Sequence, residues 1–255
     1  MDYVAIVQAR MGSSRLPHKV LKPILGIPML LRQVERIQHS KKISTIIIAT
    51  STERIDDEID IVCRENNIAC FRGSLHDVLD RYYKAAKKYA ANNVVRLTAD
   101  CPLIDATVID QVIHYFENNS LDYASNTLHP TFPDGLDVEV FRFSALERAF
   151  QHACLKSERE HVTPFLKKQE NQFNIGSYEH SQDYSAIRLT VDYEEDLLLV
   201  RKIYEMMYPE NPAFSFADIL TLITHNPWLT SINSTFIRDE GYAKSLQEDE
   251  VIKDE

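Results

Sequence analysis

The stretch Ala5–Leu21 reads AIVQARMGSSRLPHKVL, and it gathers basic side chains directly after an apolar run. Residues Tyr3–Gln8 are mostly apolar and rich in β-branched side chains, which predicts a short buried strand. Three cations follow this run around a Gly-Ser-Ser turn: Arg10, Arg15 and Lys19. A loop at the carboxyl end of the first parallel strand is where open α/β sheets bind ligands. We therefore expect this loop to form part of a binding site.

Outward from this loop, strand-like and helix-like segments alternate, which predicts βαβ units and a mostly parallel sheet. Apolar runs predict strands at 44–50, 68–71 and 93–98, and helical spacing predicts helices at 28–38, 54–66, 76–91 and 107–118. Beyond residue 122 the order changes, with strands expected at 137–143, 173–177 and 186–191 and helices at 144–153, 158–170 and 194–208. We find no internal repeat in this pattern. We predict one domain over 1–246 with an inserted β element, and a charged, frayed tail over 247–255.

The composition excludes several classes of protein. The 255-residue chain has a formal net charge of −10, whereas proteins that wrap nucleic acid usually present a basic face. Its N-terminal apolar run is too short for a signal peptide, and no apolar stretch is long enough to span a bilayer. The four cysteines form no CxxC pair and are typical of reduced thiols. We expect a cytoplasmic protein that binds neither nucleic acid nor membrane.

The first loop lacks the usual glycine-based phosphate cradles. The chain has six glycines and contains neither GxGxxG nor GxxxxGK[ST]. Phosphates would therefore be held by Arg10, Arg15 and Lys19, together with backbone N–H groups of the turn at residues 12–14. The spacing alone leaves open a simpler interpretation, which is a solvated basic loop.

Several motifs, in order along the chain, resemble one family. ARMGSSRLPHK (9–19) resembles the signature loop of nucleotidyltransferases that make CMP-activated acidic sugars, such as CMP-Kdo and CMP-acylneuraminate synthetases. The likeness extends through IIIATSTERIDDEI (46–59), RGSLHDVLDRYYKAA (72–86), RLTADCPLID (96–105) and LTVDYEEDLLLV (189–200). The spore coat polysaccharide biosynthesis protein F group is most similar, through PDGLDVEVF (133–141), SEREHVTPF (157–165) and RDEGYAKSL (238–246). The resemblance implies an α/β, GT-A-like nucleotidyltransferase fold, Rossmann-like, with a β-containing element for dimerisation or acceptor binding.

The resemblance also implies roles for individual residues. Nucleotide binding would involve Ala9, Arg10, Gly12, Ser13, Ser14, Arg15, Lys19, Thr50, Arg72, Asp80, Arg81, Thr98 and Asp100. The catalytic residues among them would be Arg10, Arg15, Lys19 and Asp100. Members of this family select cytosine in the region of Arg72, Asp80 and Arg81, so CTP is the expected donor.

Asp100 and Asp192 each follow a predicted strand, so both side chains should emerge at the carboxyl edge of the sheet. Paired carboxylates with few soft ligands nearby suit Mg²⁺, which keeps water ligands and bridges phosphates. An aspartate in this position can also be a helix N-cap. We expect that role for Asp105 before Thr107, and Asp192 could cap the helix at 194–208 in the same way. The resemblance favours metal binding for Asp100 and Asp192.

The acceptor is expected on the second half of the chain. Asp137 and Glu139 alternate along a predicted strand, which places both on one face, toward water or toward an acceptor. The resemblance makes Arg159 and His161 candidates for acceptor binding, although a lone histidine on a helix is more often structural. Aromatic residues predict an exposed patch and, with the resemblance, a homodimer: Phe132, Phe141 and Phe143.

Together these features predict a CTP-dependent cytidylyltransferase that uses Mg²⁺ and releases pyrophosphate. An acceptor oxygen would attack the α-phosphorus in line, with positioning and charge stabilisation in place of a protein nucleophile. The acceptor would be a sugar or a phosphorylated small molecule for surface polysaccharide or glycan biosynthesis. Kdo itself is not favoured, because the acceptor half departs from CMP-Kdo synthetase.

Two alternatives are a glycosyltransferase that uses a finished nucleotide-sugar and a catalytically silent nucleotide-binding module. The triphosphate loop and the absence of any Asp-x-Asp spacing disfavour the glycosyltransferase. The intact Asp100 and Asp192 disfavour the silent module.

Overall fold

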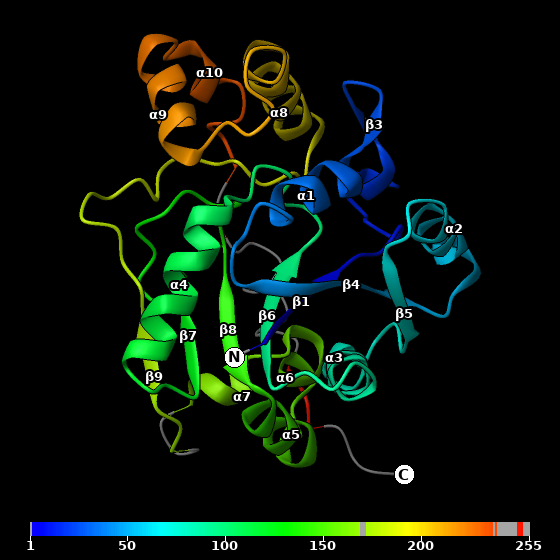
Figure 1. Ribbon diagram of the computed structural model, residues 1–255. Coiled ribbons are helices and arrows are strands. Elements are labelled where there is room, and N and C mark those ends of the chain that lie inside the picture. Colours follow the sequence, from blue (N-terminus) through cyan, green and yellow to red (C-terminus); the bar gives the residue numbers. More distant parts are fainter. Residues whose placement is uncertain (1, 169–171, 237, 239–248, 252–255) are drawn as a thin grey trace.

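The computed structural model describes residues 2–168, 172–236, 238 and 249–251. A seven-stranded sheet lies at its centre, in the order β5-β4-β1-β6-β8-β7-β9 (Figure 1). Its strands are β1 (Tyr3–Gln8), β4 (Ile43–Ser51), β5 (Ala69–Gly73), β6 (Asn93–Thr98), β7 (Tyr123–Ser125), β8 (Glu139–Arg142) and β9 (Ile175–Ser177). A small hairpin pairs β2 (Pro23–Ile24) with β3 (Ile27–Pro28).

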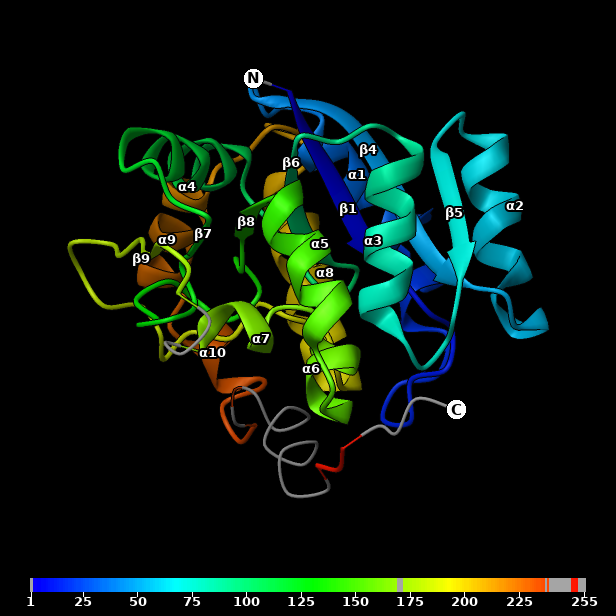
Figure 2. The same ribbon diagram turned by 90° about the horizontal axis from the view of Figure 1, so that it is seen from below.

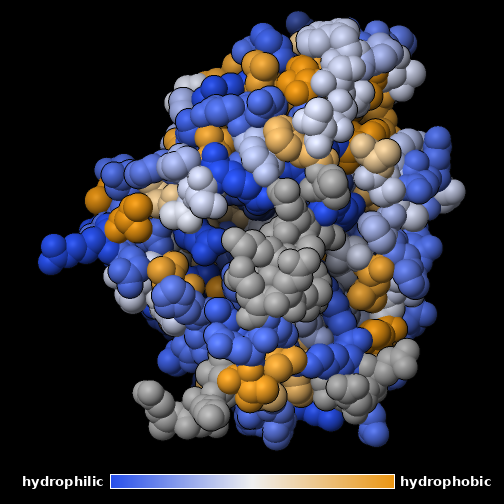
Figure 3. Space-filling model, turned by 180° about the vertical axis from the view of Figure 1, so that it is seen from behind, coloured by the Kyte–Doolittle hydropathy of each residue, from blue (hydrophilic) through white to orange (hydrophobic). Residues whose placement is uncertain are grey.

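The sheet is parallel in its first half and mixed in its second. β1 pairs in parallel with β4 and β6, and β4 pairs in parallel with β5. β8 runs antiparallel to both β6 and β7, and β9 is parallel to β7. Because parallel strands end at one edge, the loops after β1, β4 and β6 emerge together, on the lower side in Figure 2. Figure 3 shows this side face-on, with a hollow lined by hydrophilic residues.

Helices cover both faces of the sheet because side chains alternate along each strand. Tyr3, Ala5 and Val7 of β1 pack with α1 (Met29–Ile37), α2 (Asp57–Glu65) and α4 (Ala106–Asn118). Val4 and Ile6 pack on the opposite side with α3 (Val78–Lys88), α5 (Phe143–His152) and α7 (Pro164–Lys167), beside α6 (Lys156–His161). A further apolar cluster joins α8 (Glu194–Met207), α9 (Phe216–His225) and α10 (Trp228–Ser231). Two short turns are also present, η1 (Lys19–Leu21) and η2 (Arg54–Asp56).

The predicted α/β class with a mostly parallel sheet is confirmed, but two predicted elements are wrong. The strand expected at 186–191 is reduced to a single bridge between Arg188 and Asp134. The helix expected at 158–170 ends at His161 and restarts at Pro164. The break lies at Val162, whose φ of 71° and ψ of −53° leave the helical region. Pro164 then begins α7, at a position where its missing N–H costs no helical hydrogen bond.

The exposed aromatic patch predicted for the second half is also wrong. Phe132 is 1% exposed and Phe141 is fully buried. Phe132 packs against Tyr178 and against Phe216 of α9, a helix that the sequence analysis did not identify. Phe143 is partly buried beside Tyr83 of α3. These aromatic side chains fill the space beneath the inserted element.

Part of the predicted frayed tail is in contact with the fold. Asp249 accepts hydrogen bonds from N and Oγ of Ser157, at 2.9 and 2.7 Å, and Val251 forms a bridge with Leu155. The rest of the tail, and RDEGYAKSL apart from Arg238, lie outside the described residues. In the part of the chain that the structure describes, none of the helices combines the length and apolar character needed to cross a bilayer.

Candidate active site

Two cavities meet at the carboxyl edge of the sheet. The loop cavity, of about 570 Å³, is lined by the first loop, the ends of β1 and β6 and the start of α3. The insert cavity, of about 460 Å³, is lined by parts of 127–139, by the turn between α6 and α7 and by parts of 188–192. Six residues line both cavities: Gln8, Arg15, Thr98, Asp100, His161 and Asp192. Arg15 and both predicted metal aspartates therefore lie where the cavities join.

The first loop is held in place by a buried carboxylate that the sequence analysis did not single out. Asp56 is 1% exposed and accepts a hydrogen bond from Met11 N at 2.7 Å. Ser13 N and His18 N both donate to Met11 O, at 2.9 and 3.0 Å, which folds the loop back on itself. The predicted residues of this loop that line the loop cavity are Ala9, Arg10, Ser13, Ser14, Arg15 and Lys19. Gly12 is exposed and lies outside the lining.

Lys19 joins the two predicted metal aspartates. Its Nζ donates to Asp100 Oδ2 at 3.1 Å, to Asp192 Oδ1 at 2.8 Å and to Val191 O at 2.9 Å. Burial opposes the charge on Lys19, but the two carboxylates outweigh it and raise the pKa of this ammonium. Burial also raises the pKa of Asp100, yet the charge of Lys19 and hydrogen bonds from Thr98 and Lys19 lower it to about 2. Lys19 and Asp100 therefore both stay charged at neutral pH.

Asp192 faces the cavities and is not a helix cap. α8 has Tyr193 as its N-cap, and Asp196 accepts the hydrogen bonds from N of Asp192 and Tyr193, at 2.9 and 3.0 Å. Arg15 lies 2.9 Å from Asp192 Oδ1 and sits over the Tyr193 ring, 5.1 Å from its centroid. The cap that was expected of Asp105 is present, with Thr107 N donating to its Oδ1 at 2.7 Å.

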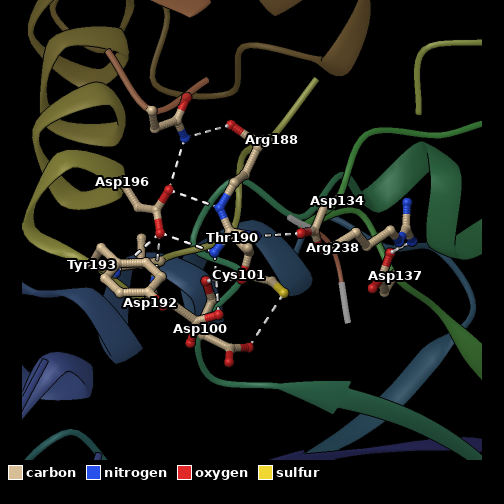
Figure 4. A network of polar contacts seen from close by, with 12 residues as sticks. Asp100, Cys101, Asp134, Asp137, Arg188, Thr190, Asp192, Tyr193, Asp196 and Arg238 are labelled. Carbon is tan, nitrogen blue, oxygen red and sulfur yellow. Dashed lines mark hydrogen bonds and ion pairs between the residues drawn. The ribbon is translucent and has the colours of Figure 1, made fainter. Parts of the chain in front are cut away.

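Arg188 was missed in the sequence analysis although a signal for it exists. It donates to Asp134 Oδ2 at 2.8 Å and to Asp192 Oδ2 at 3.2 Å from a buried position (Figure 4). RLTVD (188–192) repeats the pattern RLTAD (96–100), so each predicted metal aspartate follows an arginine by four residues.

Of the residues predicted to read the base, one reaches the loop cavity. Arg81 lines it, is 2% exposed and donates to Ser74 O at 2.8 Å. Burial lowers the pKa of Arg81, and its Nε has no hydrogen-bond partner among the described residues. The other two lie outside the lining, because Arg72 pairs with Asp57 and Asp80 pairs with Lys84. Thr50, which was predicted to bind the nucleotide, is buried in β4 and also lies outside the lining.

Glu139 organises the insert cavity from a buried position. It accepts hydrogen bonds from Tyr123 Oη at 2.6 Å and from Thr163 Oγ1 at 2.7 Å. It also pairs with Arg96 and, at 3.2 Å, with Lys167. Burial raises the pKa of Glu139, but Lys167 and Arg96 hold it well below the ordinary range. With these four donors, Glu139 mainly orients two cations at the cavity.

Asp137 lines the insert cavity and is less buried than Glu139. On α6, His161 lines both cavities and burial lowers its pKa. Arg159 lies outside the two linings and pairs instead with Asp77.

A tight turn positions His161 at the end of α6. Val162 has φ +71° and ψ −53°, and Thr163 N donates to His161 O at 2.8 Å. These values describe a strained γ-turn, which is rare and costly for a β-branched residue. The turn stops α6, so the imidazole lies on the wall that the two cavities share.

A sequence model of the cytidylyltransferase family matches residues 4–215. The chain belongs to this family. It is 36% identical over 245 residues to an uncharacterized protein of Methanocaldococcus jannaschii, covering 95% of this chain and 98% of that protein. It is 31% identical over 238 residues to the spore coat polysaccharide biosynthesis protein SpsF of Bacillus subtilis, covering 89% and 95%.

Solved structures are similar to this cytidylyltransferase over most of its length. A cytidylyltransferase from Leptospira borgpetersenii superposes with a TM-score of 0.86 at 34% identity, covering 92% of this chain and 99% of that one. The fold is also that of a CMP:2-keto-3-deoxy-manno-octonic acid synthetase complexed with CTP, at a TM-score of 0.63, 18% identity and coverage of 81% and 99%. The predicted family, fold and CTP-dependent transfer of CMP are confirmed, and the two alternative functions are not supported.

Proposed function

We propose that this cytidylyltransferase transfers CMP from CTP to a carboxylated sugar at the junction of the loop and insert cavities. The ion cluster of Lys19, Asp100 and Asp192 carries the proposal, because it stands at that junction beside Arg15. CTP would occupy the loop cavity and the acceptor the insert cavity. A hydroxyl oxygen of the acceptor attacks the α-phosphorus, the bond to the bridging oxygen breaks, and pyrophosphate leaves.

The chain's own cations would hold the triphosphate. Arg10 and Arg15 are exposed and line the loop cavity, where guanidinium groups bind phosphate oxygens in pairs. Lys19 contributes a buried point charge beside them. His161 would accept the proton of the attacking hydroxyl, because its lowered pKa leaves the imidazole neutral at pH 7.

Asp100 and Asp192 would hold a divalent cation, for which we propose Mg²⁺. Both carboxylates contact one ammonium group, so a hard cation near that point would find oxygen ligands from both. The described residues contain no group of three or more His, Cys, Asp or Glu that could hold a metal, which suits an ion completed by phosphate oxygens and water. When bound, Mg²⁺ would neutralise charge on the triphosphate.

One pair of cations in the insert cavity supports a carboxylated sugar as acceptor. Lys167 is 32% exposed in its side chain and, with Arg96, offers the cations that a carboxylate needs. Threonine hydroxyls and aspartates on the same cavity suit sugar hydroxyl groups: Thr127, Thr163, Thr190, Asp134 and Asp137. Similarity to SpsF supports a place in surface polysaccharide biosynthesis.

Pyrophosphate release with each of the four nucleoside triphosphates tests this function. The acceptors are Kdo, N-acetylneuraminate, neutral N-acetylmannosamine and glucose 1-phosphate. We expect turnover with CTP and an acidic sugar, and its loss in Asp100→Asn and Asp192→Asn. Turnover confined to the neutral or phosphorylated acceptors would refute the carboxylated class. In His161→Asn, kcat should fall by about 10²–10⁴-fold if the imidazole takes the proton, and an unchanged rate would exclude that role.

We also propose a homodimer and a cytoplasmic location. Large apolar side chains are exposed on the β2–β3 hairpin and on neighbouring α8, at Leu25, Ile27 and Leu198. The hairpin and α8 are joined by Lys22–Glu194 and by Arg201 donating to Pro23 O. All four cysteines are free thiols, which supports a reducing compartment. Cell fractionation with an antibody to the chain tests the location, and recovery in an extracytoplasmic fraction would contradict it.

A further inference from the structure

Asn233, Phe236 and Arg238 lie beyond the part of the chain that the family model matches, yet each contacts a residue of the active site. Asn233 is 2% exposed and donates to Arg188 O at 3.1 Å and to Asp196 Oδ1 at 2.8 Å. Phe236 stacks on Tyr193 with ring centroids 3.9 Å apart and ring planes at 5°. Tyr193 itself lines the loop cavity. Asn233 and Phe236 are therefore fixed at the rim of the site.

Arg238 contacts a residue of the insert cavity. Its Nη2 donates to Asp137 Oδ1 at 2.6 Å (Figure 4), and its Nη1 donates to Phe132 O at 3.1 Å. The two side chains are 16% and 31% exposed, so their attraction is only partly screened by solvent. The second hydrogen bond fixes the guanidinium to the backbone, which makes it a rigid partner for the carboxylate.

Asp137 differs from the other carboxylates near the cavity. Glu139 is occupied by four donors, and Asp134 is held by the buried Arg188. Asp137 is more exposed than either and lies two residues before β8, where it lines the cavity. An ionised carboxylate accepts hydrogen bonds from hydroxyl groups and gives them direction.

We propose that Arg238 is a positioning residue that orients Asp137 toward hydroxyl groups of the acceptor. Acceptor specificity then extends to a segment outside the nucleotidyltransferase core, whereas binding of CTP does not depend on it. This inference rests on the proposed function for the presence of an acceptor in the insert cavity, and it adds which residues recognise that acceptor.

Steady-state kinetics of Arg238→Ala, Arg238→Lys, Asp137→Asn and the double variant test the inference, with the acidic sugar that gives the fastest pyrophosphate release. We expect KM for the sugar to rise at least about 10-fold in Arg238→Ala, because one hydrogen bond to a charged group is lost. The affinity for CTP by calorimetry should not change. Arg238→Lys should recover part of the loss, because it restores the charge without the second hydrogen bond.

The double variant separates orientation from direct contact. If Arg238 acts through Asp137, then Arg238→Ala has no further effect on KM in the Asp137→Asn background. Additive effects would overturn the positioning role. Arg142→Ala is the matched control, since Arg142 also donates to a backbone oxygen, that of Leu121, and pairs with an aspartate, Asp122, outside both cavities. It should behave as the wild type.

If no panel sugar reacts, the carboxylated-sugar function fails, and the inference is tested on hydrolysis of CTP to CMP and pyrophosphate with water as acceptor. Water needs no contact with Asp137, so Arg238→Ala should hydrolyse CTP at the wild-type rate. A lower hydrolysis rate, or a weaker affinity for CTP, would place Arg238 on the nucleotide side and overturn the inference.

Discussion

The charged residues of this site form ion pairs with one another, and substrate binding must replace these pairs. Lys19 contacts Asp100 and Asp192 at 3.1 and 2.8 Å, and Arg15 contacts Asp192 at 2.9 Å. The same cations are the proposed phosphate ligands, and the same carboxylates are the proposed metal ligands. A divalent cation held by Asp100 and Asp192 would leave Lys19 and Arg15 available to the phosphates. CTP and Mg²⁺ should therefore bind interdependently.

Calorimetry with Mg²⁺ and with EDTA measures this coupling. We expect Mg²⁺ to strengthen CTP binding by about 5–150-fold, the usual range for coupled sites.

Arg15→Ala should weaken CTP binding by about 1.5–3 kcal/mol, because a charge-assisted hydrogen bond is lost. Lys22→Ala is the control, because Lys22 pairs with the exposed Glu194 at 3.0 Å. Equal affinities for CTP in the two variants would exclude Arg15 as a phosphate ligand.

Glu139 makes the stability of the fold depend on pH. Its pKa in the folded protein is held below the ordinary 4.5, so the ionised group stabilises the fold above about pH 4.5 and this stabilisation is lost as the pH falls. Glu139→Gln should lower the free energy of unfolding by about 3–5 kcal/mol at neutral pH, since it leaves buried cations uncompensated.

Urea denaturation between about pH 5 and pH 3 checks the sign. The stability of the wild type should fall more steeply with acid than that of Glu139→Gln. Glu205→Gln, which removes an exposed pair with Lys202, should follow the wild type. Parallel slopes for wild type and Glu139→Gln would show that Glu139 has no such linkage.

At the scale of elements, the site depends on turns that bring separate segments together. Asp56 fixes the first loop from the turn η2, and the γ-turn at Val162 ends α6 at His161. The turn at residues 133–136 approaches the segment 187–190, with Asp134 N donating to Ile187 O and Leu189 N donating to Asp134 O. This contact brings Asp134 to Arg188 and closes one side of the insert cavity.

Gly135 is required for that contact. It has φ +103°, and a Cβ there would lie 2.5 Å from Thr190 N and 2.6 Å from the carbonyl carbon of Leu189. Gly135→Ala should therefore lower the free energy of unfolding by about 1–3 kcal/mol or more, as overpacking does. Gly12→Ala, whose Cβ would meet nothing within 4 Å, should change it by less than about 0.5 kcal/mol. Thermal and urea unfolding compare them, and equal stabilities would contradict the close approach.

At the scale of the whole molecule, the parallel half of the sheet lies beside the mixed half. Asp192, from the C-terminal part of the chain, lines the junction of the two cavities. The proposed dimer would cover the hairpin and α8, where Leu25, Ile27 and Leu198 are 42, 39 and 47% exposed. Exposed apolar side chains that lie together favour an interface. The aromatic residues that first suggested a dimer are buried and give no support to it.

Sedimentation equilibrium at micromolar concentration tests the dimer. We expect twice the chain mass of 29.4 kDa for the wild type and a monomer for Leu198→Glu. The control is Glu210→Lys, at an exposed position, and this variant should remain dimeric. Leu222→Glu would be unsuitable as a control, because Leu222 packs against the cluster of α8 and α9. A wild-type mass near that of one chain would refute the dimer.

The sequence by itself determined the regular half and the charge chemistry. β1 and β6 have the predicted bounds, because continuous apolar runs with β-branched residues have few other solutions in a buried sheet. The basic loop and the two aspartates were identified because each follows an apolar segment at the sheet edge. These features are local in sequence, so a pattern of neighbouring residues is enough to predict them.

Only the tertiary structure decided which charges meet and which aromatic residues are buried. Arg72, Asp80 and Arg159 form ion pairs away from the cavities, while Arg188 and Arg238 reach Asp192 and Asp137. Long cationic side chains have several carboxylates within reach, and the choice depends on burial and on backbone contacts far away in sequence. Phe132 is likewise buried by a helix more than eighty residues later. Such contacts follow from the packing of whole elements and not from the pattern of neighbouring residues.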